Sequence, residues 1–168
     1  RGDHCLKFMM ESLEDLDDRL REKHTRLYLF QGAPDQVVER CISALHIDSV
    51  VVNRDYTPYS RQRDDRIKGV CKAHGVAFYS FDDALLQPPE DTLKNDGKPY
   101  VIFTPYFRNA SKQTIPDPVL NKETNYYREP IPFAAERNLL SGMLLQLTAS
   151  NSLRGGRTEA LKILKKLT

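Results

Sequence analysis

The feature that most constrains the fold of this chain is a strand–helix–strand succession in its first half. Residues 48–53 contain three consecutive valines, Pro58 begins a helical pattern, Gly75 ends it, and residues 76–81 form a second apolar run. Strands that are apolar along their whole length, rather than alternately apolar and polar, are typical of a parallel sheet covered by helices on both faces. The sequence therefore predicts an α/β fold with a doubly wound parallel sheet.

The spacing of apolar residues, together with prolines and glycines, predicts the other elements. An amphipathic helix is expected over residues 3–23, where Met9, Leu13, Leu16 and Leu20 share one face. The other expected segments are a strand over 26–30, a helix over 34–45, a helix from Tyr106 to about 112 after the cap Thr104 and Pro105, an extended connector over 114–133, a helix over 134–147, a break at 150–152 and 155–156, and a helix over 157–167. These segments divide the chain into an α/β part over 1–113, the connector over 114–133 and a helical part over 134–168.

Proline and tyrosine residues shape the expectations for the connector and the core. The connector is expected to be extended because it contains Pro116, Pro118, Pro130 and Pro132, and ordered because Tyr126 and Tyr127 can pack. Two tyrosines in predicted strands, Tyr28 and Tyr79, are expected in the core. The candidates for exposed contacts are Tyr56, Tyr59, Tyr106, Tyr126 and Tyr127.

Composition excludes several classes of protein. The 25 basic and 23 acidic residues nearly cancel, so the formal charge of +2 does not require a nucleic-acid or membrane partner. No apolar stretch approaches the ~20 residues that a bilayer demands, and the first residues lack the pattern of a signal peptide. Cys5, Cys41 and Cys71 show neither a disulfide framework nor zinc-ligand spacing. We therefore expect a cytoplasmic protein with buried, reduced thiols and no membrane partner.

The common catalytic motifs are missing from the sequence. It contains no GxGxxG, no Walker A loop, no GxSxG and no HExxH. The histidines are scattered at expected helix ends and loops, where solvated or capping roles are commonest. The adjacent carboxylates of Asp82 and Asp83 point to opposite faces of an extended segment, so capping is expected rather than acid–base chemistry. No residue is assigned a catalytic role.

The most informative segment is residues 53–64, NRDYTPYSRQRD, which follows a predicted central strand and begins a helix. Parallel sheets bind ligands at the carboxyl ends of their strands, and a helix N-terminus with arginines favours an anionic or planar cofactor. Spacing alone favours a simpler interpretation, in which Arg61 and Arg63 pair with the aspartates at positions 55, 64 or 65 and fix the loop.

Five segments occur in a distinctive order and spacing: FMMESLEDLD at 8–17, LYLFQG at 27–32, residues 53–64 with their Pro-Tyr-x-Arg-x-Arg-Asp core, FDD at 81–83 and FTPYF at 103–107. Together they resemble the N-terminal α/β domain of the DNA photolyase and cryptochrome family, and the resemblance covers nearly the whole chain. Gly155-Gly156-Arg157 and the helix after them are similar to the entrance to that family's flavin-binding helical domain. The resemblance implies the Rossmann-like fold of the family's N-terminal domain.

The resemblance also implies a fragment. Relative to the family, the chain lacks the initial strand, helix and strand, and the FAD-binding helical domain would follow Thr168. The parent protein is then expected to be a light-dependent DNA-repair lyase that uses reduced FAD to split pyrimidine dimers. Its helical domain is expected to bind FAD and UV-damaged DNA, its full-length form to be monomeric, and this fragment alone to be inactive.

The α/β domain of the family binds a light-harvesting antenna chromophore and supports the flavin domain. The resemblance places five residues nearest this chromophore: Asn53, Arg54, Asp55, Tyr59 and Arg61. Members with a folate antenna carry an Asn-Glu pair where Tyr59 and Ser60 stand here, which favours a flavin or deazaflavin, or no antenna, over folate.

Two alternatives remain open on the sequence. A cryptochrome, a signalling flavoprotein without repair activity, shares the same domain. A free-standing nucleotide- or flavin-binding module has the same fold class, but the apolar face of the helix over 160–167 counts against it.

Overall fold

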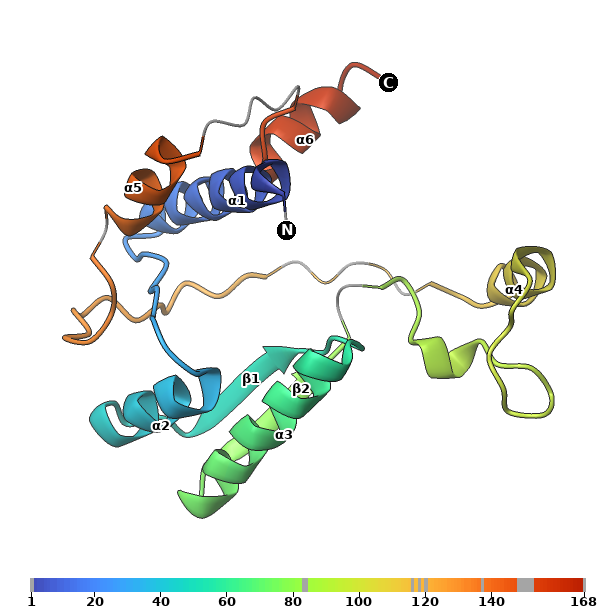
Figure 1. The fold of residues 1–168 in the computed structure, drawn as a ribbon, viewed down its shortest axis with the longest axis horizontal. Helices are drawn as coiled ribbons and strands as arrows, with labels where there is room; N and C mark the ends of the chain where they lie inside the picture. Colours follow the sequence, from blue (N-terminus) through green and yellow to red (C-terminus); the bar gives the residue numbers. More distant parts are fainter. Residues whose placement is uncertain are drawn as a thin grey trace. The chain divides into compact units, whose positions relative to one another are not determined.

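The computed structural model describes residues 2–82, 85–115, 117, 119, 121–136, 138–147 and 153–167. The chain divides into two compact units, which are drawn in Figure 1. Unit 1 consists of Arg1–Gln31 with Asn121–Thr168, and unit 2 consists of Gly32–Leu120. The expectations for Asp83, Pro116, Pro118 and the break at 150–152 lie outside the described residues.

Unit 2 contains a two-stranded parallel sheet. Its elements in chain order are α2 (Pro34–Ala44), β1 (Ser49–Asn53), α3 (Pro58–Ala73), β2 (Ala77–Phe81), the 3₁₀ helix η1 (Pro89–Asp91) and α4 (Phe103–Ala110). β1 and β2 pair in parallel from Ser49 opposite Ala77 to Asn53 opposite Phe81. The α/β fold class and the parallel strands are therefore confirmed.

Helix α3 forms the core of unit 2 with one face of the sheet. Its Ile67 and Cys71 are buried, and α3 contacts both strands and α2. On the opposite face of the sheet, Val51, Tyr79 and Phe81 are 58%, 51% and 57% exposed, and the two rings stack at 6.4 Å. The expectation that Tyr79 lies in the core is wrong, because it shares the face that α3 does not cover.

Unit 1 is built around helix α1 (Asp3–Arg21), which contacts α5 (Leu139–Leu145) and α6 (Arg157–Leu164). The buried residue of α1 is Met10, whereas Met9 and Leu16 are 46% and 43% exposed. The helix is therefore confirmed, but the apolar face expected for it is rotated. Asp17 explains the error, since its carboxylate lies on the better-buried side, pairs with Arg21 at 2.7 Å and accepts a hydrogen bond from the backbone.

The strand expected at 26–30 is wrong, since the structure shows no strand there. The backbone of this segment has other partners: the Leu27 N–H donates to the Asp17 carboxylate at 2.8 Å, and the Leu29 carbonyl accepts from the Ala135 N–H at 2.7 Å. Because the Ala135 N–H is bonded to Leu29, Ala135 is not part of the helix expected over 134–147. Helix α5 begins only at Leu139.

The described part of the connector contacts the segment before unit 2. The rings of Tyr28 and Tyr127 lie 5.8 Å apart, and the Lys23 ammonium donates to the Tyr126 hydroxyl at 3.0 Å. The tyrosines of the connector therefore pack as expected.

Helix α4 begins one residue before the expected cap. Its N-cap is Ile102 rather than Thr104, and Pro105 stands in the first turn. A proline is tolerated there because the N–H groups of the first turn have no partner within the helix.

The cysteines and the helices agree in part with the expectations from composition. All three cysteines are free, with Cys71 buried, Cys41 intermediate and Cys5 exposed, so the expectation of buried thiols is wrong for Cys5. Burial raises the pKa of the Cys71 thiol.

None of the helices within the described ranges is both long and apolar enough to cross a membrane.

Candidate functional site

The candidate site lies at the carboxyl ends of β1 and β2, which is the edge where parallel sheets hold ligands. The Arg54 N–H donates to the Phe81 carbonyl at 2.8 Å and so continues the pairing one residue beyond β1. Because Asn53 stands opposite Phe81, the residues that follow the two strands are brought side by side. This geometry places Arg54 and Asp82 at the same point of the sheet edge.

Asp55, Thr57 and Ser60 form a chain of hydrogen bonds that begins helix α3. The Ser60 N–H donates to the Thr57 hydroxyl at 3.2 Å, and the Ser60 hydroxyl donates to the Asp55 carboxylate at 2.8 Å. The Asp55 carboxylate also accepts from the Thr57 N–H at 3.1 Å. These hydrogen bonds, the one from the Thr57 N–H foremost, lower the pKa of Asp55. Asp55 therefore stabilises the first turn of α3.

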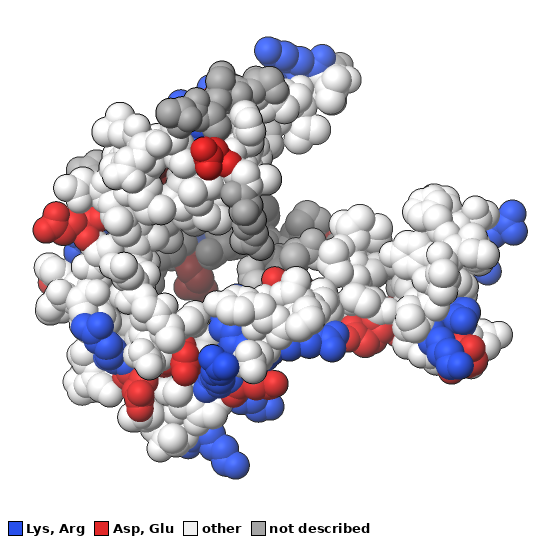
Figure 2. All heavy atoms as spheres, viewed as in Figure 1, with Lys and Arg blue, Asp and Glu red and all other residues white. Residues whose placement is uncertain are grey.

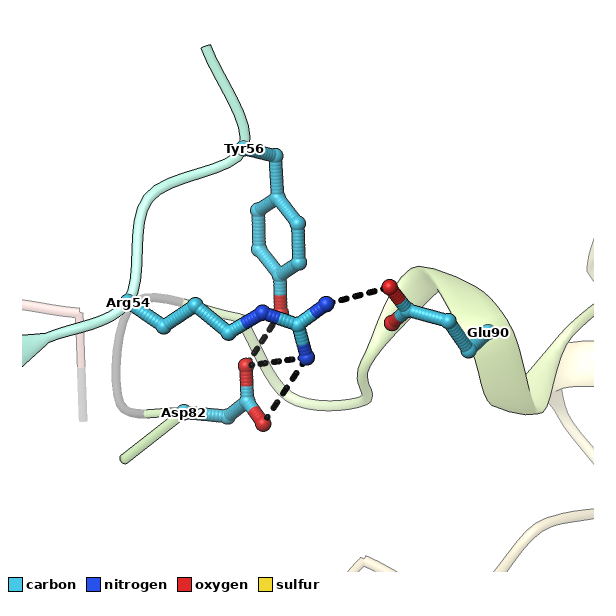
Figure 3. Close-up of polar contacts among 4 residues, drawn as sticks. All are labelled: Arg54, Tyr56, Asp82 and Glu90. Carbon is cyan, nitrogen blue, oxygen red and sulfur yellow. Dashed lines mark hydrogen bonds and ion pairs between the residues drawn. The ribbon is translucent and has the colours of Figure 1, made fainter. Parts of the chain in front are cut away.

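Arg54 is the centre of a polar cluster with Tyr56, Asp82 and Glu90 (Figure 3). Its guanidinium pairs with Glu90 and lies 3.4 Å from the Asp82 carboxylate. The Tyr56 hydroxyl donates to Asp82, and the Arg54 guanidinium carbon lies 4.7 Å from the centre of the Tyr56 ring. The cluster joins the end of β1 to the end of β2 and to η1.

The pKa shifts of Arg54 and Tyr56 are caused by contacts within this cluster. The hydrogen bond to Glu90, followed by the charges of Glu90 and Asp82, raises the pKa of Arg54. The hydrogen bond to Asp82 raises the pKa of the Tyr56 hydroxyl. One guanidinium thus faces two carboxylates, and its charge is already compensated within the chain.

Sequence reasoning missed the partners of Arg54. Asp82 was expected to act as a cap, but it accepts hydrogen bonds from Arg54 and Tyr56 instead. The contact between Arg54 and Asp82 could have been predicted from the strand register, because residues that follow two paired parallel strands become neighbours. Glu90 had no such signal, since its position depends on the course of the chain after Asp82.

Tyr59 and Arg61 occupy the first turn of α3 and are exposed, Tyr59 at 67%. The simpler interpretation of the arginines is confirmed for Arg63, which pairs with Asp64 at 2.7 Å. Among the described residues, none forms an ion pair with Arg61. Asn53 ends β1 with its side chain on the same face as Phe81.

The start of α3 carries an exposed cation, Arg61, and an exposed ring, Tyr59. No group of three potential metal ligands gathers anywhere in the described ranges. Figure 2 shows basic and acidic side chains interspersed on the face that it draws, in keeping with the small net charge.

Comparison with known proteins gives a consistent result. The family model for DNA photolyase matches residues 1–124. A deoxyribodipyrimidine photo-lyase of Synechococcus sp. is 30% identical over 112 residues, which are 67% of this chain and 23% of that protein. Cryptochrome-1 of Aedes aegypti is 32% identical over 96 residues, which are 57% of this chain and 18% of that protein.

Solved structures agree with the sequence comparison. The crystal structure of the archaeal photolyase of Sulfolobus tokodaii, which contains two FAD molecules, matches with a TM-score of 0.79 and 31% identity. The match covers 98% of this chain and 35% of that one. The matched part of the chain thus spans 18% to 35% of the lengths of these three relatives. Both the matched residues and the fold show that the chain belongs to the DNA photolyase family.

Proposed function

We propose that the protein carrying this chain is a deoxyribodipyrimidine photolyase, a lyase that uses light and reduced FAD to split cyclobutane pyrimidine dimers in UV-damaged DNA. The observation that carries this proposal is the family match over residues 1–124, together with relatives named as photolyases. In this proposal the catalytic FAD and the DNA are bound by a helical domain outside the 168 residues, and the protein is cytoplasmic and monomeric.

In the same proposal, residues 1–113 form the part that holds an antenna chromophore. Residues 114–133 connect this part to residues 134–168, which lead into the FAD domain. A light-harvesting cofactor is implied for the S. tokodaii photolyase, whose two FAD molecules make a flavin a reasonable antenna here. Such a chromophore supplies light absorption and energy transfer. The protein supplies only its placement.

The five proposed site residues divide into two roles. Tyr59 and Arg61 are exposed at the start of α3, and we assign them to contact the ring and the anionic group of the chromophore. Arg54 and Asp55 are bound within the chain, so we assign them to hold the loop that carries these contacts. Asn53, the fifth residue, stands at the end of β1, directly before Arg54.

Substitution of Arg61 tests the antenna role. In the full-length protein, Arg61→Ala should remove most of the antenna absorption while leaving photoreduction of the catalytic FAD unchanged, because the exposed guanidinium provides the charge for the anionic group. Arg66→Ala, which removes an exposed arginine farther along α3, is the matched control and should change neither. Equal loss of both chromophores in Arg61→Ala would instead assign Arg61 to folding.

A cryptochrome is the second candidate, favoured by the similarity to the Aedes aegypti protein. A single assay separates the two functions: the full-length protein is illuminated in the presence of a dimer-containing oligonucleotide, and repaired product is measured. Light-dependent repair supports the photolyase. A flavoprotein that is photoreduced without repairing the oligonucleotide would be the cryptochrome.

A further inference from the structure

Unit 2 contains an apolar pocket that the candidate site does not use. It lies between the segment around η1 and helix α4, and its volume is about 620 Å³. Its lining is mainly apolar and aromatic, with Leu85, Leu86, Tyr100, Tyr106 and Phe107 among the contributors. Small-molecule sites in proteins typically have volumes of about 300–1,000 Å³ and linings of this kind.

Hydrogen bonds between side chain and backbone hold the two walls of this pocket together. Gln87 on one wall donates to the Ala110 carbonyl at the end of α4 at 3.1 Å, and Asn109 of α4 donates to the Leu93 carbonyl at 3.3 Å. Gln113 donates to the hydroxyl of Thr92, a residue that is only 4% exposed, at 3.2 Å. These hydrogen bonds fix the two walls of the pocket relative to each other, and the pocket itself is open to solvent, with Leu86 75% and Phe107 56% exposed.

The lining also defines the chemistry of a ligand. None of the described residues that line the pocket is charged, so a charged group placed in it would lose its hydration without compensation. The aromatic side chains form a connected group, with Tyr100 and Tyr106 edge to face at 6.4 Å, and Phe103 and Phe107 stacked at 5.7 Å. Aromatic walls of this kind favour a planar ring that can stack or meet them edge-on.

We propose that this pocket binds an uncharged, planar aromatic molecule of two or three fused rings, at a site separate from the arginine-bearing candidate site. The proposal does not depend on the proposed function. Tyr106 and Ser111 carry the lining hydroxyl groups that the hydrogen bonds between the walls do not use, and these would orient such a heterocycle.

Riboflavin is a suitable probe because its three-ring system carries no charge at neutral pH. Titration of the full chain with riboflavin, followed by fluorescence anisotropy, should give saturable binding. Phe107→Leu keeps an apolar side chain but removes one ring of the wall, and it should weaken binding about two- to tenfold. Phe81→Leu, at a 57% exposed ring outside the pocket, is the matched control and should leave binding unchanged.

A charge substitution gives a second test that does not depend on ring loss. Leu86→Asp places a carboxylate at the rim of the uncharged lining and should weaken binding about two- to fivefold, whereas Val101→Asp, at a 94% exposed position outside the pocket, should not. Circular dichroism of each variant checks that the fold is retained. Leu86 is itself 75% exposed, so its replacement is expected to be compatible with folding.

Several outcomes would overturn the proposal. The first is failure of the chain to bind riboflavin up to its solubility limit, and the second is binding that neither Phe107→Leu nor Leu86→Asp changes. Weakening by Arg61→Ala alone would assign the ring to the candidate site. Self-association of the chain that disappears in Leu86→Asp would show that a second copy, rather than a small molecule, covers the pocket.

Discussion

Arg54 and Asp55 are adjacent residues of opposite charge, and the chain uses both to fix its own backbone. Arg54 ties the sheet edge to η1 through Glu90, and Asp55 holds the first turn of α3 through Thr57 and Ser60. The pairs of Arg54 are substantially exposed, so each adds little to stability in water. Their effect is positional, because they fix the backbone between the end of β1 and the first turn of α3.

The cap of α3 provides a prediction at the scale of a single residue. Thr57→Ala removes the acceptor for the Ser60 N–H and should lower the free energy of unfolding by about 1 kcal/mol. Denaturant unfolding measures the change. Thr57→Ser, which keeps the hydroxyl, should recover most of it, and Thr114→Ala, at an exposed threonine outside any helix, should have almost no effect. A loss for Thr57→Ser equal to that for Thr57→Ala would show that the cap is unimportant.

At the scale of elements, the N-terminus of α6 is attached to the side of α1 by unusually close contacts. The Gly155 N–H donates to the Glu11 carboxylate at 2.8 Å, and the Thr158 N–H donates to Asp15 at 3.2 Å. A Cβ atom at Gly155 would lie 2.2 Å from the Phe8 carbonyl oxygen, and one at Gly156 would lie 2.7 Å from the Asp15 side chain. The two glycines therefore permit a distance between the helices that no other residue allows.

A pair of glycine substitutions tests this close approach. Gly155→Ala should destabilise unit 1 by about 1–3 kcal/mol, because backbone rather than a flexible side chain blocks the added methyl group. Gly142→Ala, inside α5 with open space around it, should instead stabilise the helix by about 0.5–1 kcal/mol. Thermal unfolding of both variants checks the opposite signs. A neutral Gly155→Ala would contradict the contact.

The attachment of α6 should also depend on pH. The hydrogen bonds from Thr158 lower the pKa of Asp15 below its ordinary value of 3.8. A carboxyl group with a depressed pKa in the folded state adds stability that is fully present well above pH 3.8 and is lost as the pH falls through the folded pKa. The protection of the Thr158 amide against hydrogen exchange, measured by NMR relative to the intrinsic rate, should therefore fall as the pH is lowered below 3.8. Asp15→Asn should abolish this extra pH dependence, and its persistence would assign the effect to another group.

Elements with a strong local pattern could be predicted from the sequence, and elements that depend on distant partners could not. The valines of β1 and the prolines at the starts of α2 and α3 are local signals, and the structure contains these elements within a few residues of their expected bounds. The segment 26–30 has β-prone residues, but its backbone bonds to the Asp17 side chain and the Ala135 N–H instead of to a neighbouring strand. Local propensity contains no information about such partners.

At the scale of the whole chain, the described sheet has one covered face and one exposed face. Val52 points toward α3 and is half-buried, whereas its neighbour Val51 is 58% exposed. Val52→Ala should therefore cost about 2 kcal/mol of stability, and Val51→Ala less than about 0.5 kcal/mol. Urea unfolding of both variants in the full-length protein makes the comparison. Equal costs would mean that the face carrying Val51 is covered there.

The order of the two units along the chain has a consequence for biosynthesis. Unit 2 is one uninterrupted stretch, whereas unit 1 is assembled from segments on either side of it. A ribosome therefore completes Gly32–Leu120 before any residue of α5 or α6 exists, and domains tend to fold as they emerge. Helix α1 precedes unit 2 in the chain, yet its contacts with α5 and α6 can form only after unit 2 has been synthesised. During that interval the side of α1 that carries Met10 lacks those partners, and it is an apolar surface that a nascent-chain chaperone would bind.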